Sequence, residues 1–234
     1  MKMDAMPNLD NEVKDLIERI RSSNNVDDRT YNALLKIGKR AVPMLVEALK
    51  DQNQMVRATA QVVLEKIGKD AVPGLAAALS GKDRAVWPAA AELLGKIGDR
   101  KAVPALMEAL KAGKRKTKMN AATALGMLKD PKAVPVLLRA MLDPDLGVLG
   151  HASEALEKIG RPAVPGLIRL LLKYKDFEVR EHAILALRDI GDARAVPALR
   201  KLARSYPDSR IGDDAAEALH ALMKASTPAK TASE

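Results

Sequence analysis

The three histidines are the side chains of this sequence best suited to acid–base or metal chemistry. His151 and His182 each stand eight residues before an Ile-Gly pair, so they occupy equivalent places. Packed helices lie about 10 Å apart, too far for two such side chains to share one metal ion. Glu181 adjoins His182, whereas Gly150 adjoins His151. Because a di-iron centre needs several converging carboxylates and histidines, we predict no metal site and no cofactor.

Other catalytic arrangements are missing from the sequence as well. It contains no cysteine, which excludes disulfides, zinc–thiolate sites, iron–sulfur clusters and cysteine nucleophiles. It has no glycine-rich phosphate loop and no nucleophile elbow. The pairs Asp27-Asp28 and Asp213-Asp214 are predicted to open helices, where carboxylates interact favourably with the helix N-terminus. We therefore predict that the protein is not an enzyme.

The densest group of charges in the sequence is basic. Five cations fall within eight residues: Lys111, Lys114, Arg115, Lys116 and Lys118. Positive charges at a helix start oppose the helix dipole, so nothing local favours them there. One interpretation is that they bind an acidic protein surface, an anion or a nucleic acid. The other is that they form a solvated loop. The net charge of +9 and the 2% aromatic content allow phosphate contacts but offer few rings for base stacking.

The elements that position these residues come from a repeat. The tripeptide Ala-Val-Pro begins at residues 41, 71, 102, 133, 163 and 195. An Ile-Gly pair precedes five of the six copies, and Leu128-Lys129 replaces it in the remaining one. Self-similarity at a fixed period of this length is the signature of stacked repeat units.

Each repeat predicts a pair of amphipathic helices. The first carries apolar residues at helical spacing, as in Val42, Leu45, Val46 and Leu49. The second carries a wider stripe, as in Val56, Ala60, Val63, Leu64 and Ile67. Proline near the start of the first helix and glycine after the second fit the preferences of helix ends. With 47% hydrophobic residues but few aromatic ones, the core must be built from small aliphatic side chains.

Such hairpins cannot cover their apolar faces alone and must stack on one another. We therefore predict an all-α fold, a right-handed α-solenoid of about seven helical hairpins. Residues 1–38 form a degenerate capping helix pair, and residues 39–225 form six repeats of about 31 residues continuous with it. The small, polar residues 226–234 are expected to be disordered.

The repeat resembles a known family. The pattern Ile-Gly-Asp-x-x-Ala-Val-Pro-x-Leu at residues 190–199, followed by second helices of the Glu178-Val179-Arg180 type, is similar to the HEAT-like repeat of phycobilisome lyases. The resemblance covers roughly residues 30–223. It implies a scaffold or adaptor protein, or a bilin-lyase-like or other enzyme-associated subunit. In such repeats the arginine that follows the first valine of the second helix, paired with an acid such as Asp51 for Arg57, links neighbouring layers.

That arginine position changes character in the middle of the chain. Three consecutive repeats place Trp87, Lys118 and Leu149 there, and Met119 follows Lys118. In one interpretation Trp87 and Met119 fill gaps between layers. In the other they form an apolar spot on the second-helix face, where an exposed tryptophan would be a binding hot spot. The sequence alone does not separate the two.

We predict non-catalytic protein–protein recognition on the concave face formed by the second helices. The predicted partner-binding residues are Trp87, Lys114, Arg115, Lys116, Lys118 and Met119. The partner is another protein with an acidic surface, and nucleic-acid binding through the basic patch is the less favoured alternative. The first seven residues contain no apolar run typical of a signal peptide, and no apolar run reaches about 20 residues. We therefore expect a cytoplasmic protein that does not insert into membranes.

Overall fold

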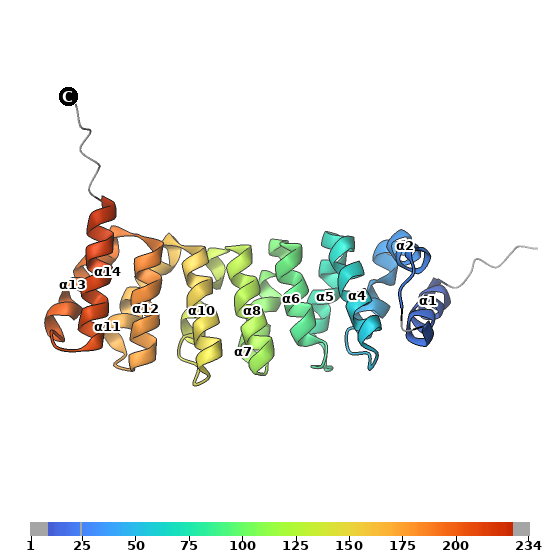
Figure 1. Ribbon diagram of the computed structural model, residues 1–234, viewed down its shortest axis with the longest axis horizontal. Coiled ribbons are helices and arrows are strands. Elements are labelled where there is room, and N and C mark those ends of the chain that lie inside the picture. The colour runs from blue at the N-terminus through green and yellow to red at the C-terminus, as the bar shows by residue number, and fades with distance from the viewer. Residues whose placement is uncertain (1–8, 24, 227–234) are drawn as a thin grey trace, which may run out of the picture. The chain divides into compact units, whose positions relative to one another are not determined.

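The computed structural model describes residues 9–23 and 25–226 and shows an all-α fold there, with no strand (Figure 1). The chain divides into two compact units, Met1–Ala124 and Leu125–Glu234, and the boundary falls within α8. The predicted all-α fold of helical hairpins is confirmed. The predicted disordered tail lies outside the described residues, apart from Ser226, which ends α14.

The N-terminal unit (Met1–Ala124) holds four hairpins. Its helices are α1 (Leu9–Ser23), α2 (Asp28–Ile37), α3 (Val42–Ala48), α4 (Gln54–Ile67), α5 (Val72–Ser80), α6 (Trp87–Ile97), α7 (Val103–Ala112) and the start of α8 (Arg115–Leu128). Its first hairpin consists of α1 and α2.

The C-terminal unit (Leu125–Glu234) begins with the end of α8. Its other helices are α9 (Val134–Ala140), α10 (Leu146–Ile159), α11 (Val164–Lys173), α12 (Phe177–Ile190), α13 (Val196–Ser205) and α14 (Arg210–Ser226). No helix in the described ranges is both long and apolar enough to cross a membrane.

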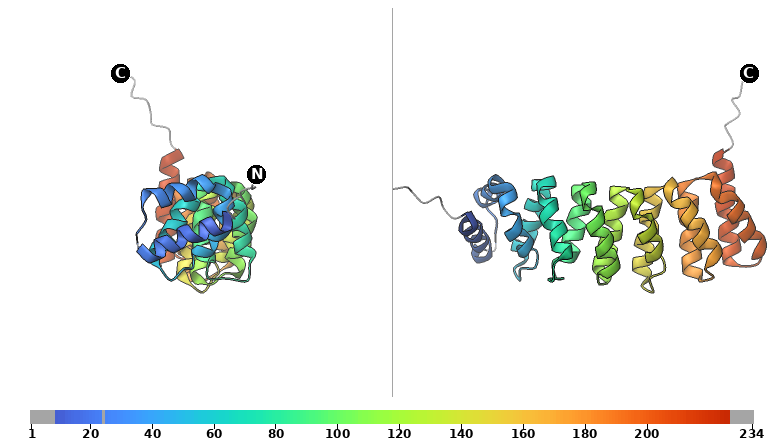
Figure 2. Two further views of the ribbon diagram at one scale, coloured as in Figure 1. Left: turned by 90° about the vertical axis from the view of Figure 1, so that its right-hand side faces the viewer. Right: turned by 180° about the vertical axis from the view of Figure 1, so that it is seen from behind.

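Within each unit the first helices of the hairpins form one layer and the second helices form another (Figures 1 and 2). A short 3-10 turn joins each hairpin to the next and ends on the alanine of Ala-Val-Pro, which is fully buried in all six copies. The following proline lies at the start of the first helix, where no backbone donor is needed.

Glycine ends the second helices because the backbone turns left-handed there. The glycine of each Ile-Gly pair has a positive φ, for example 76° at Gly98 and 73° at Gly191. In the copy that lacks this glycine, Lys129 adopts a φ of 50°. The repeat therefore imposes the turn even where its preferred residue is absent.

Small residues let neighbouring hairpins approach closely. A side chain on Gly74 would meet Val42, and one on Gly166 would meet Leu138. On the second-helix layer a Cβ at Gly126 would lie 2.8 Å from Ala155 Cα. Small residues on the second helices thus allow neighbouring hairpins to pack closely.

Candidate functional site

The arginine position of the second helices points back into the loop of its own hairpin. Arg57 donates from Nη1 to the backbone oxygens of Asp51 and Gln52, at 2.6 and 2.8 Å. Arg180 donates from Nε to the backbone oxygen of Tyr174 at 2.7 Å. These arginines therefore stabilise the loop inside one repeat. The charge of Arg57 also contributes to lowering the pKa of Asp51, but both residues belong to the same hairpin, so the expectation that they link neighbouring repeats is wrong.

Asp51 instead links neighbouring hairpins through a different arginine. Its carboxylate accepts a hydrogen bond from Arg21 Nη2 of the preceding hairpin at 2.5 Å. That bond is the main reason why the pKa of Asp51 is held below its usual value.

Trp87 is buried. Trp87 stands at the position that Arg57 and Arg180 hold in their repeats, and it is 6% exposed. Leu149, at the same position of a later repeat, is 2% exposed. The guanidinium of Arg84 lies 5.0 Å from the centre of the Trp87 ring, and the indole Nε1 has no hydrogen-bond partner. The burial supports packing between layers rather than an exposed hot spot, because this position faces the interior of the hairpin.

The remaining predicted residues lie at the start of α8. Lys114, Arg115 and Lys116 are exposed, whereas Lys118 and Met119 are half-buried. Arg115 and Lys118 are already engaged in interactions of their own. Lys114 and Lys116 make no ion pair with any residue that the structure describes. The free positive charge of the predicted site is therefore concentrated on these two lysines.

The start of α8 also lacks an acidic or amide cap. Four other second helices begin after residues whose side chains accept backbone N–H bonds, namely Asp27, Asn53, Asp145 and Asp176, whereas α6 begins after Val86, which makes no such bond. Lys114 stands at this place before α8 and can only donate. Its charge adds to the partial positive charge of the helix N-terminus instead of offsetting it.

The fold brings two further cations to these lysines. Arg84 donates from Nη1 to the backbone oxygen of Ala112 at 3.1 Å, so the α5–α6 loop lies against the α7–α8 loop. Lys82, in the α5–α6 loop, is exposed. We call Lys82, Arg84, Lys114 and Lys116 the basic loop cluster. Sequence reasoning missed the first two, although aligning successive repeats would have placed their loop beside residues 111–116.

The acids near the basic loop cluster are occupied by other cations. Asp83 pairs with Lys50, and this hydrogen bond is the main reason why its pKa is lowered. Glu108 pairs with Lys111 at 2.8 Å. Neither carboxylate therefore neutralises Lys114 or Lys116.

Two of the three histidines are held by their own helices. His182 Nδ1 donates to the backbone oxygen of Glu178 at 2.9 Å, and His151 Nδ1 donates to that of Gly147 at 2.7 Å. A carbonyl oxygen can only accept, so Nδ1 carries the proton in both rings. The two equivalent histidines thus make the same local contact with their own helix.

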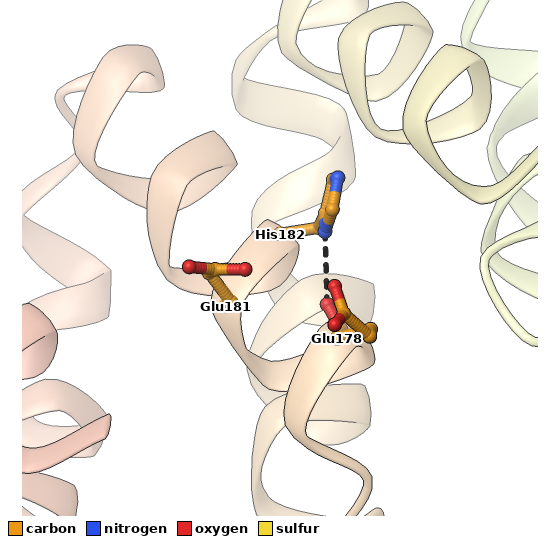
Figure 3. Close-up of side chains that lie close together, drawn as sticks. All are labelled: Glu178, Glu181 and His182. Atoms are coloured by element: carbon orange, nitrogen blue, oxygen red, sulfur yellow. Dashed lines mark hydrogen bonds between the residues drawn. The ribbon is translucent and has the colours of Figure 1, made fainter. Parts of the chain in front are cut away.

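Glu178, Glu181 and His182 form the group of side chains closest to a metal-binding arrangement (Figure 3). Their potential ligand atoms lie within 4.8 Å of one another. In Figure 3 the carboxylate of Glu181 lies to the left of Glu178 and His182 on the same helix, α12. Glu181 also pairs with Arg210 of the next hairpin. A metal ion at this group would therefore compete with Arg210 for the Glu181 carboxylate.

A groove of about 1020 Å³ lies between α1 and α3 in the N-terminal unit. Ile17 and Met44 contribute apolar surface, and the rim mixes cations with acids. Several of these charges pair with one another, as Arg21 does with Asp51. The groove contains none of the sequence-predicted binding residues.

Comparison with known proteins agrees with this architecture. HEAT repeats match residues 72–157 and 143–220, and no curated protein matches the chain. The complex of CpcE and CpcF of phycocyanin lyase from Nostoc sp. PCC7120 superposes with a TM-score of 0.52 at 22% identity, covering 63% of this chain and 98% of that chain.

Two further solved structures are similar. The Kap95:Nup1 complex superposes with a TM-score of 0.55 at 16% identity, covering 91% of this chain and 34% of that chain. An engineered protein superposes with a TM-score of 0.49 at 23% identity, covering 90% of this chain and 68% of that chain. At these identities the likeness concerns the fold. Because the family match spans more than half of the sequence, this chain belongs to the HEAT-repeat proteins.

Proposed function

We propose that this protein is a non-catalytic scaffold that binds an acidic partner protein on its second-helix side, with the basic loop cluster as the point of first contact. The single observation that carries the proposal is the pair of exposed lysines, Lys114 and Lys116, which no described acid neutralises. Exposed cations at a helix start are unfavourable for the fold and are therefore expected to serve binding.

The HEAT-repeat architecture supports a protein partner. Two of its structural neighbours are complexes, Kap95 with Nup1 and CpcE with CpcF. Stacked helices form a long, preorganised surface, so binding costs little conformational entropy. Among the described residues, the histidine and carboxylate side chains that converge closely enough to hold a metal ion are Glu178, Glu181 and His182, where Arg210 pairs with Glu181.

The contributions of four of the predicted residues follow from their environments. Lys114 and Lys116 would attract the partner over a distance, because unpaired surface charges mainly raise the rate of association. Met119, half-buried beside them, would supply apolar contact area. Trp87 would contribute indirectly, because its buried ring stacks against the guanidinium of Arg84. Arg84 can then present its charge to the partner from a fixed place.

The test is capture of partners from a lysate of the source organism, with and without nuclease, by the normal chain and by Lys114→Glu with Lys116→Glu. We expect a discrete protein band that survives nuclease and that the double variant retains about tenfold more weakly. Glutamates in the first turn of α8 would favour the helix, so this variant should not lose stability.

A matched control carries the same change of net charge elsewhere in the N-terminal unit. Lys66→Glu with Lys69→Glu alters two exposed lysines near the opposite end of the hairpins and should retain the partner normally. Equal retention by all three proteins would refute the role of the cluster. Retention of nucleic acid, released by salt and removed by nuclease, would instead assign the cluster to phosphate binding.

A further inference from the structure

The first helices of the C-terminal unit present a surface that is entirely basic. The helices α9, α11 and α13 contain no aspartate or glutamate. Six exposed cations lie on them: Arg139, Arg169, Lys173, Arg200, Lys201 and Arg204. We call these six residues the outer basic face. They belong to the layer opposite the second helices α10, α12 and α14 (Figures 1 and 2).

The equivalent helices of the N-terminal unit carry acidic or uncharged residues at a position that is basic in α9, α11 and α13. The comparison uses the residue five places after the first valine of each first helix. In α3, α5 and α7 that residue is Glu47, Ala77 and Glu108, whereas in α9, α11 and α13 it is Arg139, Arg169 and Lys201. The repeat framework itself therefore does not require a cation at this position.

The fold explains only part of the outer basic face. Arg139, Lys173 and Arg204 lie in the last turns of their helices, where the dipole favours cations. Arg169 and Arg200 lie further inside, each four residues before another cation, and like charges at this spacing repel. None of the six forms an ion pair with a residue in the described ranges.

A groove of about 390 Å³ opens within this face, between α9 and α11. Its apolar part comes from Leu138, Leu142 and Leu170. Leu142 is 37% exposed, so part of its side chain is available for contact. The remaining lining residues are Arg139, Arg169, Lys173 and Tyr174. Every charged residue of the groove is thus basic.

We propose that the outer basic face binds an acidic peptide segment that inserts a leucine-like side chain into the groove between α9 and α11. The guanidinium groups of Arg139 and Arg169 match carboxylates in geometry and charge. Leu142 and its neighbours receive the apolar side chain. A nucleic acid has no aliphatic side chain to fill the groove, and a membrane surface would favour protruding apolar residues over a hollow.

This surface is separate from the basic loop cluster, which belongs to the other unit and to the α5–α6 and α7–α8 loops. The two proposals therefore stand or fall independently. A protein can lose the contact made by Lys114 and Lys116 and keep the one made by Arg139 and Arg169, and the reverse also holds.

The experiment measures binding of a fluorescent peptide of repeating Glu-Glu-Leu units to the full chain. Two other peptides, of Glu-Glu-Ala units and of glutamate alone, separate the apolar contribution from the charge. Labelled oligothymidylate serves as the nucleic-acid probe, and phosphatidylserine vesicles serve as the membrane probe. Titrations at low and moderate salt show whether the attraction is electrostatic.

Two pairs of variants test the residues. Arg139→Glu with Arg169→Glu is matched by Lys158→Glu with Lys224→Glu, which changes the charge equally on exposed second-helix residues of the same unit. Leu142→Ser is matched by Leu185→Ser, since both leucines are 37% exposed. We expect Arg139→Glu with Arg169→Glu to lower the affinity for the Glu-Glu-Leu peptide about tenfold. We expect Leu142→Ser to lower it about threefold to tenfold. The two controls should bind normally, and thermal unfolding by circular dichroism verifies that each variant is folded.

Three results would overturn the proposal. The first is absence of binding of the Glu-Glu-Leu peptide to the normal chain. The second is an equal loss of peptide affinity in a control variant and in the variant that it is matched to, which would place the contact elsewhere. The third is binding of oligothymidylate or vesicles that depends on Arg139 and Arg169 but not on Leu142, which would make the face a phosphate-binding surface.

Discussion

Replacing Trp87 with alanine tests whether this residue belongs to the core or to a binding surface. The side chain is 6% exposed, so the substitution removes nearly its whole contact area and leaves a cavity. Removing a buried tryptophan in this way costs about 3–5 kcal/mol. The stacking of Arg84 on the ring, about 0.5–1 kcal/mol, is lost as well.

One opposing effect reduces this cost. The indole Nε1 is buried without a hydrogen-bond partner, and such a group costs about 1–3 kcal/mol that alanine would recover. We therefore expect Trp87→Ala to lower the free energy of unfolding by about 3 kcal/mol. Trp87→Phe keeps most of the ring contact and also removes the unpaired donor, so its change should stay within about 1 kcal/mol.

The assay is urea unfolding followed by far-ultraviolet circular dichroism, because the alanine variant has no tryptophan to follow. In the normal chain Trp87 is the single tryptophan, so its fluorescence reports on this site alone. A loss of less than about 1 kcal/mol for Trp87→Ala would show that the ring is not packed. Together with strong quenching of the fluorescence by a soluble quencher, it would restore the interpretation of Trp87 as an exposed binding residue.

Three further outcomes follow from individual sites. Gly126→Ala should destabilise the C-terminal unit by about 1–2 kcal/mol, because overpacking against the backbone of Ala155 exceeds the gain in helix propensity. Gly150→Ala should stabilise it by about 0.5–1 kcal/mol, because the new methyl group would have only His182 nearby, at 3.8 Å, and urea unfolding compares the two variants. The hydrogen bond from Arg194 lowers the pKa of Asp192 to about 2, so its stabilising effect is complete above pH 4 and is lost as the pH falls toward 2. Asp192→Asn should therefore flatten the pH dependence of the free energy of unfolding in that range. If this free energy falls with decreasing pH as steeply in the variant as in the unmodified chain, Asp192 does not have this role.

The start of α8 shows where prediction of the site from sequence reached its limit. The basic cluster was found because five cations crowd into eight residues. Which of them are available for binding depends on partners elsewhere in the fold, and Arg115 and Lys118 already have interactions. Lys82 and Arg84 lie about 30 residues earlier in the chain and join the cluster only through the contact of Arg84 with Ala112.

The sequence by itself determined the helical hairpins and their ends. Apolar periodicity, proline at the first turn and glycine after the last are local signals, and each acts within a few residues of the place it specifies. Even Lys129 follows the pattern set by the repeat, although its φ of 50° is unusual for a residue with a side chain.

Only the tertiary structure decided which side chains are exposed. Exposure depends on the neighbouring hairpin, about 30 residues away, which covers one face of each helix and leaves the other open. For this reason Trp87 is buried although the sequence equally allowed an exposed ring. For the same reason Arg139, Arg169 and Lys201, far apart in the chain, occupy equivalent exposed positions on consecutive first helices of one unit.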